Sequence, residues 1–274
     1  MDRDAFRSKY GSWALIAGAS EGLGAAWARR LAELGLNVHL VARREQLLEQ
    51  TAQELRRSFP QVQVETQALD LGCDDLLGKL APLDERDFGL VVYNAAYAII
   101  QPFLAHDAEQ LEGYVDVNCR APLLLAHHFG ERFRQRGRGG IILMSSMVGF
   151  SGASMFGPYA ATKSFLLTLG EALYHELGPK GVDALVCVAG ATRTPGYLGS
   201  EPHYAWWFKP SESEPQSVVD ETLEQLGRKP VHVAGTWNRV TLFMLQRVLG
   251  RNLATRLIND TLKRTYSHHN GGAR

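Results

Sequence analysis

A tyrosine and a lysine four residues apart are the side chains in this sequence best suited to chemistry. Tyr159 and Lys163 belong to the stretch Tyr159-Ala-Ala-Thr-Lys163, which reads as part of a helix. At that spacing both side chains lie on one helix face, one turn apart. A free phenol has a pKa of about 10, and a nearby positive charge favours its ionised form. Lys163 is placed to supply that charge, although an ordinary solvated pair on a helix would show the same spacing.

Two adjacent serines precede this pair in the sequence. Hydride addition to a carbonyl creates an alkoxide, which needs a hydrogen-bond donor on its oxygen and a proton source. Ser146 and Tyr159 are one of each. Because neighbouring residues on an extended segment point to opposite sides, Ser145 competes with Ser146 for the first role. Alternatively, both serines cap a loop.

A glycine-rich turn, Gly18-Ala-Ser-Glu-Gly22-Leu-Gly24, follows the first predicted strand and opens the first predicted helix. Glycines let the backbone approach a pyrophosphate, which the free amides and the positive end of the helix attract. The G-x-x-x-G-x-G spacing, with no Lys-Ser/Thr after it, disfavours a P-loop for ATP or GTP. The turn therefore predicts dinucleotide binding, the alternative being a plain tight turn.

The second predicted strand ends at Ala42 and is followed by Arg43 and Arg44. An NAD site usually offers Asp or Glu at this point, about 20 residues after the glycine-rich turn. A guanidinium suits a 2′-phosphate instead, so the sequence favours NADP over NAD. The alternative is that two arginines begin an exposed helix.

Apolar runs alternate with amphipathic segments along the chain, as in a parallel sheet covered by helices. The predicted strands are 13–17, 38–42, 62–69, 90–93, 141–145, 184–188 and 231–234. The predicted helices are 23–34, 46–58, 74–80, 108–134 and 159–177. We therefore predict an α/β fold: a Rossmann-type, doubly wound parallel sheet of about seven strands with helices on both faces, in one domain spanning 1–274.

Composition limits the class of protein further. A chain of 274 residues that is 45% hydrophobic is long enough for one large domain. Its 29 basic and 29 acidic residues give no electrostatic reason to expect a nucleic acid or an anionic membrane as partner. The three scattered cysteines suit a reducing compartment and argue against a disulfide framework or a zinc site. The charged start and the lack of a long apolar run argue against a secretory signal and a membrane span. Together with the cysteines, they lead us to expect a cytoplasmic protein without a metal.

These features, taken in order, resemble the short-chain dehydrogenase/reductase family over about residues 12–235. The motifs that carry the resemblance are Gly18-Ala-Ser-Glu-Gly22-Leu-Gly24, Asp70-Leu71, Asn94-Ala95-Ala96, Asn118, Ser145-Ser146, Tyr159-Ala-Ala-Thr-Lys163 and Ala189-Gly190-Ala-Thr-Arg-Thr194-Pro195. The resemblance implies hydride transfer between a nicotinamide and a carbonyl or alcohol group. It also implies a homodimer or homotetramer.

The resemblance implies four catalytic residues. Tyr159 would be the proton donor in carbonyl reduction, and Ser146, favoured over Ser145 by the family's spacing, would hydrogen-bond the substrate oxygen. Lys163 would lower the pKa of Tyr159 and hold the nicotinamide ribose. Asn118 would anchor a water molecule that links Lys163 to solvent.

The implied cofactor site is larger. Asp70 would meet the adenine, Asn94 and Ala95 would lie against the cofactor, and Thr194 would face the nicotinamide carboxamide. The full set of implied cofactor-binding residues is Gly18, Ser20, Glu21, Gly22, Leu23, Gly24, Arg43, Arg44, Asp70, Leu71, Asn94, Ala95, Tyr159, Lys163, Thr192 and Thr194.

The chain departs from the family pattern at several positions. Ala17 stands where the family often has Thr, Ala96 where it often has Gly, and Ala189 where it often has Pro. Glu21 stands where many NADP-dependent relatives carry a basic residue. The NADP prediction therefore depends on Arg43, with Ser20 and Arg44 as further candidates.

Two apolar stretches indicate the substrate class. In the first, at about 195–215, the resemblance implies a mobile lid. Its large apolar side chains are Tyr197, Leu198, Tyr204, Trp206, Trp207 and Phe208. They could wall a pocket, or pack the lid onto the protein or a partner subunit. The second stretch, between Ser146 and Tyr159, holds Met147, Val148, Phe150, Met155 and Phe156. We therefore expect a hydrophobic ketone, aldehyde or alcohol.

A helical extension at about 238–266 follows the last predicted strand and is amphipathic and basic. It could cover the domain or a dimer partner, or lie on a membrane surface. For the whole chain we predict an NADP-linked oxidoreductase. The alternatives are an NADPH-binding sensor or scaffold without turnover, and an epimerase or dehydratase on the same fold.

Overall fold

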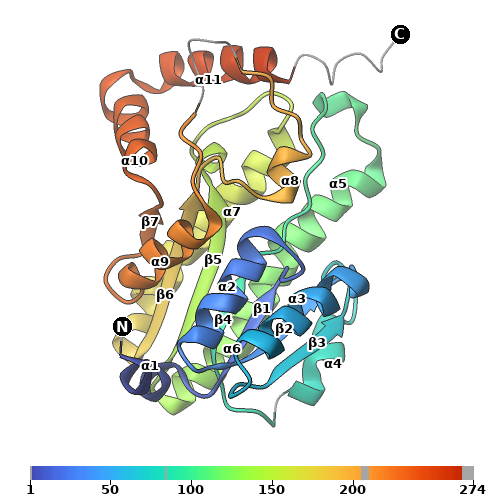
Figure 1. Cartoon of the computed structure of the whole chain (residues 1–274). Helices are drawn as coiled ribbons and strands as arrows, with labels where there is room; N and C mark the ends of the chain where they lie inside the picture. Colours follow the sequence, from blue (N-terminus) through green and yellow to red (C-terminus); the bar gives the residue numbers. More distant parts are fainter. Residues whose placement is uncertain (1, 84, 205–209, 267–274) are drawn as a thin grey trace.

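The computed structural model describes residues 2–83, 85–204 and 210–266. Its strands are β1 Trp13–Ala17, β2 Asn37–Ala42, β3 Val64–Ala68, β4 Phe88–Tyr93, β5 Gly139–Ser146, β6 Val182–Ala189 and β7 Val231–Val233. They form one parallel sheet in the order β3-β2-β1-β4-β5-β6-β7 (Figure 1). The strand order reverses between β1 and β4, and ligands of doubly wound folds bind at that switch point. The prediction of a seven-stranded doubly wound sheet is confirmed.

The central strands form because their residues are apolar on both faces, as parallel strands covered by helices require. Every residue of β1 is buried. Ala14 and Ile16 belong to one apolar core, and Leu15 and Ala17 to the other. The sheet is thus the middle layer of three.

Eleven α-helices lie among the described residues: α1 Arg3–Tyr10, α2 Gly22–Glu33, α3 Glu45–Ser58, α4 Leu76–Leu80, α5 Ala108–Val115, α6 Ala121–Arg136, α7 Gly157–Leu177, α8 Pro195–Leu198, α9 Pro215–Gln225, α10 Thr236–Phe243 and α11 Arg251–Thr265. Side chains of α2, α3 and α9 fill the core on one face of the sheet. Those of α4, α6 and α7 fill the other. No described helix is long and apolar enough to cross a membrane.

The prediction of a single long helix over 108–134 is wrong in one respect. A π-helical turn, η3 Asp116–Arg120, separates α5 from α6. Such turns often occur at functional sites. Here the turn places Asn118 with its side chain fully buried.

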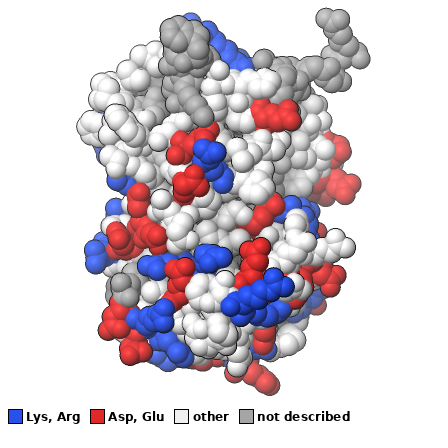
Figure 2. Space-filling model, in the orientation of Figure 1, with Lys and Arg blue, Asp and Glu red and all other residues white. Residues whose placement is uncertain are grey.

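The C-terminal extension is present and consists of α10, the π-helical segment η6 Met244–Val248, and α11. In Figure 1, α11 lies across the end of the molecule, beyond α7 and α8. Figure 2 shows largely uncharged surface around α10. The predicted pocket residues Trp206, Trp207 and Phe208 lie outside the described residues.

Candidate active site

A cleft of about 430 Å³ lies at the carboxyl ends of β1, β2 and β4. Its lining contains most of the residues expected to bind the cofactor. They are Gly18, Ser20, Glu21, Gly22, Leu23, Arg43, Arg44, Asp70, Leu71, Asn94, Ala95 and Thr194. Ala42, Ala96, Tyr97, Val117 and Gly196 complete the wall.

The glycine-rich turn has its shape because side chains would not fit. Gly18 has φ +84°, and a Cβ there would lie 2.6 Å from the backbone of Ala95. A Cβ on Gly24 would lie 1.9 Å from the carbonyl oxygen of Gly18. Asn94 Nδ2 donates to that same oxygen at 2.8 Å and ties β4 to the turn. The turn thus forms an open backbone cradle of the kind that a pyrophosphate needs.

The start of α2 leaves its positive end available to this cleft. Glu21 occupies the N-cap position but makes no side-chain capping hydrogen bond. The first amides of a helix have no partner within the helix and attract anions. The geometry therefore fits a dinucleotide cofactor.

One of the two basic residues after β2 pairs with the Glu21 carboxylate, which would otherwise repel a 2′-phosphate. Arg44 Nη2 lies 2.6 Å from Glu21 Oε1 and donates to Ser20 Oγ at 3.1 Å. Arg43 lines the same cleft, is exposed, and makes no ion pair with any described residue. Glu21 therefore does not prevent phosphate binding here, because Arg44 pairs with it.

The end of β5 and the first two turns of α7 bring together the predicted catalytic side chains. Lys163 is only 2% exposed, and its Nζ donates to the carbonyl oxygen of Met144 at 2.7 Å. Its Nζ also lies 5.4 Å from the centroid of the Tyr159 ring. The Tyr159 hydroxyl is hydrogen-bonded to the side chain of Ser146. Ser145 instead donates to the backbone oxygen of Lys163 at 2.8 Å, so the structure places Ser146, and not Ser145, next to the phenol.

Burial dominates the protonation of this pair. It raises the pKa of Tyr159 to about 12, and the hydrogen bond with Ser146 only partly opposes that shift. It lowers the pKa of Lys163 to about 8. The expected lowering of the Tyr159 pKa by Lys163 is therefore not what this structure shows, because desolvation of the phenol is the largest effect on that pKa.

Asn118 lies directly beside the pair. Its Oδ1 accepts from the backbone N–H of Tyr97 at 2.7 Å, and its Nδ2 donates to the carbonyl oxygen of Tyr97 at 2.8 Å. Nδ2 also donates to Thr162 Oγ1 at 3.1 Å. Both amide hydrogens thus have protein partners. Asn118 joins the cleft wall at Tyr97 to the helix that carries Lys163.

The two threonines after β6 have different surroundings. Thr194 lines the cleft, and its Oγ1 accepts from the backbone N–H of Tyr197 at 3.2 Å, which caps α8. Thr192 is buried and donates to the carbonyl oxygen of Gly190 at 3.1 Å. Thr192 therefore does not line the cleft, although it was predicted to bind the cofactor.

One neighbour of the site, Tyr266, carried no signal in the sequence. Phe156 lies between two phenol rings, with centroids 6.5 Å from that of Tyr159 and 5.1 Å from that of Tyr266. Tyr266, which directly follows α11, is about a hundred residues away along the chain. Only the folded molecule shows that the end of α11 packs against Phe156, next to Tyr159.

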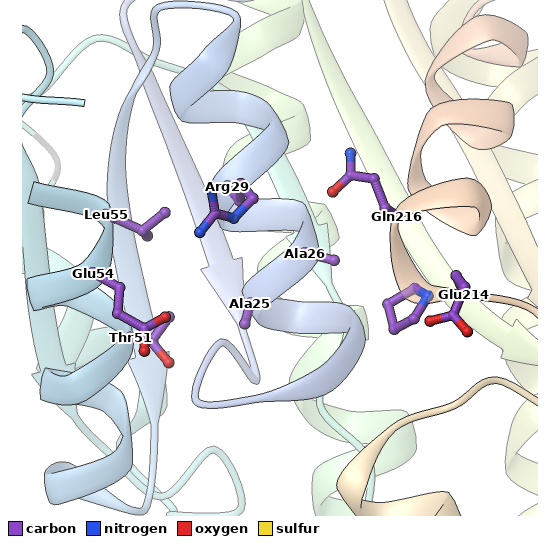
Figure 3. A pocket seen from close by; sticks show the side chains of 9 residues that line it. Ala25, Ala26, Arg29, Thr51, Glu54, Leu55, Glu214 and Gln216 are labelled. Atoms are coloured by element: carbon purple, nitrogen blue, oxygen red, sulfur yellow. The ribbon is translucent and has the colours of Figure 1, made fainter. Parts of the chain in front are cut away.

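A second hollow, of about 260 Å³, lies between α2, α3 and the start of α9 (Figure 3). It is lined by Ala25, Ala26, Arg29, Thr51, Glu54, Leu55, Glu214, Pro215 and Gln216. None of these is a predicted site residue. Among the described residues there is also no group of three His, Cys, Asp or Glu side chains that could hold a metal ion.

Comparison with known proteins agrees with this geometry. The short chain dehydrogenase family model matches residues 12–201. The 7β-hydroxysteroid dehydrogenase of Mediterraneibacter gnavus is 31% identical over 239 residues, which cover 86% of this chain and 90% of that protein.

Solved structures show the same relationship. A 7β-hydroxysteroid dehydrogenase structure matches with a TM-score of 0.85 and 30% identity, over 92% of this chain and 98% of that one. A short-chain dehydrogenase from Sphingobium yanoikuyae in complex with NADPH has a TM-score of 0.72 and 33% identity, over 81% of this chain and 87% of that one. The chain therefore belongs to the short-chain dehydrogenase family and is an oxidoreductase that acts on CH–OH or C=O groups.

Proposed function

We propose that the protein transfers hydride between NADP(H) and a bulky hydrophobic ketone, aldehyde or secondary alcohol. One observation carries the proposal: through Tyr97 and Asn118, a backbone cradle and an arginine-bearing cleft are joined to the helix of the Ser146–Tyr159–Lys163 cluster, in which Lys163 is buried. The cradle suits a dinucleotide, and the cluster suits proton transfer to a carbonyl oxygen.

The cofactor, when bound, supplies or accepts the hydride through its nicotinamide. The turn from Gly18 and the start of α2 would hold the pyrophosphate. Arg43 would bind the 2′-phosphate, and Asp70 would meet the adenine. Lys163 would hold the nicotinamide ribose, and Thr194 would face the carboxamide. The NADPH complex of the Sphingobium relative supports this assignment.

The protein's own groups would act on the substrate oxygen. Ser146 would donate a hydrogen bond to it, and Tyr159 would deliver the proton. A phenol whose pKa is raised to about 12 keeps its proton at neutral pH, as a proton donor in reduction must. Asn118 would hold Lys163 in position through Thr162.

The substrate would be large and apolar. Met147 and Phe150, after β5, pack against an apolar cluster beside the site, and Met155 and Phe156 precede Tyr159. The 7β-hydroxysteroid dehydrogenase relatives support a polycyclic alcohol or ketone. We also propose that the protein is cytoplasmic, from its three free cysteines, and that it is a homodimer or homotetramer.

Titration with reduced nucleotides, followed by protein and cofactor fluorescence, tests the cofactor assignment. NADPH should bind more tightly than NADH, and Arg43→Ala should weaken NADPH binding by about 10-fold or more, as for a lost charged hydrogen bond. NADH binding should not change. Arg57→Ala, an exposed arginine at the end of α3, is the matched control. Equal affinity for both nucleotides would refute the NADP assignment.

A ketone screen then separates the kinds of function. Consumption of NADPH with a hydrophobic ketone supports the proposal. Tight NADPH binding without turnover would instead indicate a sensor or scaffold. Product formation without net NADPH consumption would indicate an epimerase or dehydratase.

A further inference from the structure

The turn before α7 has an unusual backbone conformation next to the catalytic tyrosine. Met155 is buried and has φ +68°, a left-handed conformation that is costly for a residue with a side chain. Its carbonyl oxygen accepts from the backbone N–H of Gln101 at 3.2 Å. Phe156 follows directly, with its ring beside that of Tyr159. Something outside the turn must hold it in this shape.

One side chain of α11 makes two hydrogen bonds to the turn and a third within its own helix. Asn259 Oδ1 accepts from the backbone N–H of Ser154 at 2.6 Å. Its Nδ2 donates to the carbonyl oxygen of Gly152 at 3.0 Å, and also to that of Thr255 in its own helix at 2.7 Å. The amide therefore joins the backbone of the turn, on both sides of Ala153, to α11.

Neighbouring contacts keep α11 in place above the turn. Thr255 Oγ1 lies 3.1 Å from Ser151 Oγ, within hydrogen-bond distance. At the other end of the helix, the ring of Tyr266 packs edge-on against Phe156 at 5.1 Å. The backbone N–H of His203 donates to the carbonyl oxygen of Thr265 at 3.0 Å. The helix thus contacts both the turn and the segment after α8.

We propose that Asn259 is a positioning residue of the substrate site: by holding the turn 152–155, it fixes Met155 and Phe156 beside Tyr159 and so determines how bulky ketones fit. A carbonyl that reaches the hydroxyls of Ser146 and Tyr159 has its substituents next to Phe156. Movement of the turn changes that wall without touching the cofactor cleft. The inference depends on the proposed ketone reductase function.

The test compares Asn259→Ala with Asp260→Ala, a neighbouring exposed position on the same helix. Hydrogen exchange of the peptide covering 151–156 reports on the turn, and NADPH titration reports on the cofactor cleft. Steady-state reduction of a steroid ketone and of cyclohexanone reports on the substrate site. Asn259→Ala should speed exchange in 151–156 and raise KM for the steroid ketone by about 10-fold, typical of altered apolar contacts. NADPH affinity, and kcat with cyclohexanone, should stay within about 2-fold of wild type.

Asn259→Asp keeps the acceptor for Ser154 but sets a carboxylate oxygen against the carbonyl oxygens of Gly152 and Thr255, so it should also speed exchange and raise KM. It carries the test if the alanine variant does not fold. Unchanged exchange would overturn the inference. Faster exchange with an unchanged KM ratio between the two ketones would also overturn it, since Asn259 would then be merely structural. If the wild-type protein binds NADPH but reduces no ketone, the proposed function itself fails. The exchange data would still show whether Asn259 holds the turn, so the two failures are distinguishable.

Discussion

At the scale of single residues, Tyr159 carries the largest expected effect. Tyr159→Phe removes the hydroxyl and keeps the ring that packs beside Phe156. Reduction should fall by at least about 100-fold, as for the loss of a general acid. NADPH affinity should be retained, which titration and steady-state turnover together would show. Tyr174→Phe, later on α7, is the matched control, and wild-type turnover in Tyr159→Phe would contradict the mechanism.

The pH dependence of reduction follows from the two buried groups. Tyr159, with its pKa raised to about 12, stays protonated throughout the useful range. Lys163, with its pKa lowered to about 8, is charged below that pH and neutral above it. The kcat/KM for the ketone should therefore be level below about pH 8 and fall above it, as the ammonium beside the phenol is lost. A profile that stays level up to pH 10 would contradict this assignment.

At the scale of the elements, the strands of the sheet were predictable and three of the helices, α1, α8 and α9, were not. Strands such as β1 and β4 are apolar on both faces, which leaves a continuous signal. Helix α1 has a mostly polar sequence and buries only Phe6 and Tyr10, so no apolar stripe marks it. Helix α9 begins at Pro215 after an irregular segment, and its few buried residues become meaningful only where they meet α2.

The site was predictable where motifs have fixed local spacing and not where the fold joins distant segments. The glycine-rich motif lies within a single turn, and Tyr159 and Lys163 lie within a single helix. The residues alone left Ser145 and Ser146 open, and the family's spacing favoured Ser146; in the structure Ser145 bonds to the backbone of α7 instead. The contact of Asn259 with the turn before α7 spans about a hundred residues, which no local pattern encodes.

The glycine-rich turn gives a prediction that combines binding and stability. A Cβ at position 24 would lie 1.9 Å from the Gly18 carbonyl oxygen, so the turn must move in Gly24→Ala. We expect lower stability by about 1–3 kcal/mol, as for overpacking, and much weaker NADPH binding. Thermal unfolding and nucleotide titration measure these two effects. Gly178→Ala is the control, because a Cβ there meets nothing within 4 Å; equal behaviour of the two variants would count against the cradle.

At the scale of the whole molecule, two sets of exposed apolar residues are accompanied by exposed residues of opposite charge. The C-terminal surface comprises the exposed residues Trp237, Phe243, Val248, Leu253 and Leu257 with Arg247, Arg251 and Arg256. The α5 surface comprises Phe103, Leu104, Asp107, Glu109 and Glu112. Leu104 is 93% exposed and Trp237 is 68% exposed, which is unusual for side chains that prefer burial. The C-terminal extension therefore does not use this apolar face to cover its own domain.

Pairing of the C-terminal surface of one copy with the α5 surface of another would bury both and bring opposite charges together. Pairing of the C-terminal surface with itself would place arginines opposite arginines, which is unfavourable. We therefore expect the proposed homo-oligomer to use the first arrangement; stable complexes bury roughly 800 Å² per partner.

Paired substitutions on the two surfaces test this interface. The double variant Trp237→Glu/Phe243→Glu, and separately Leu104→Glu, should each lower the molar mass in solution from that of a dimer or tetramer, because a buried carboxylate opposes association on either side. Light scattering after size-exclusion chromatography measures the mass, and circular dichroism confirms that the fold is retained. Arg57→Glu, on exposed α3, should leave the mass unchanged. High salt should also favour dissociation, because it screens the attraction between the acidic and basic surfaces. A wild-type monomer, or variants that keep the wild-type mass, would show that the protein does not assemble through these surfaces.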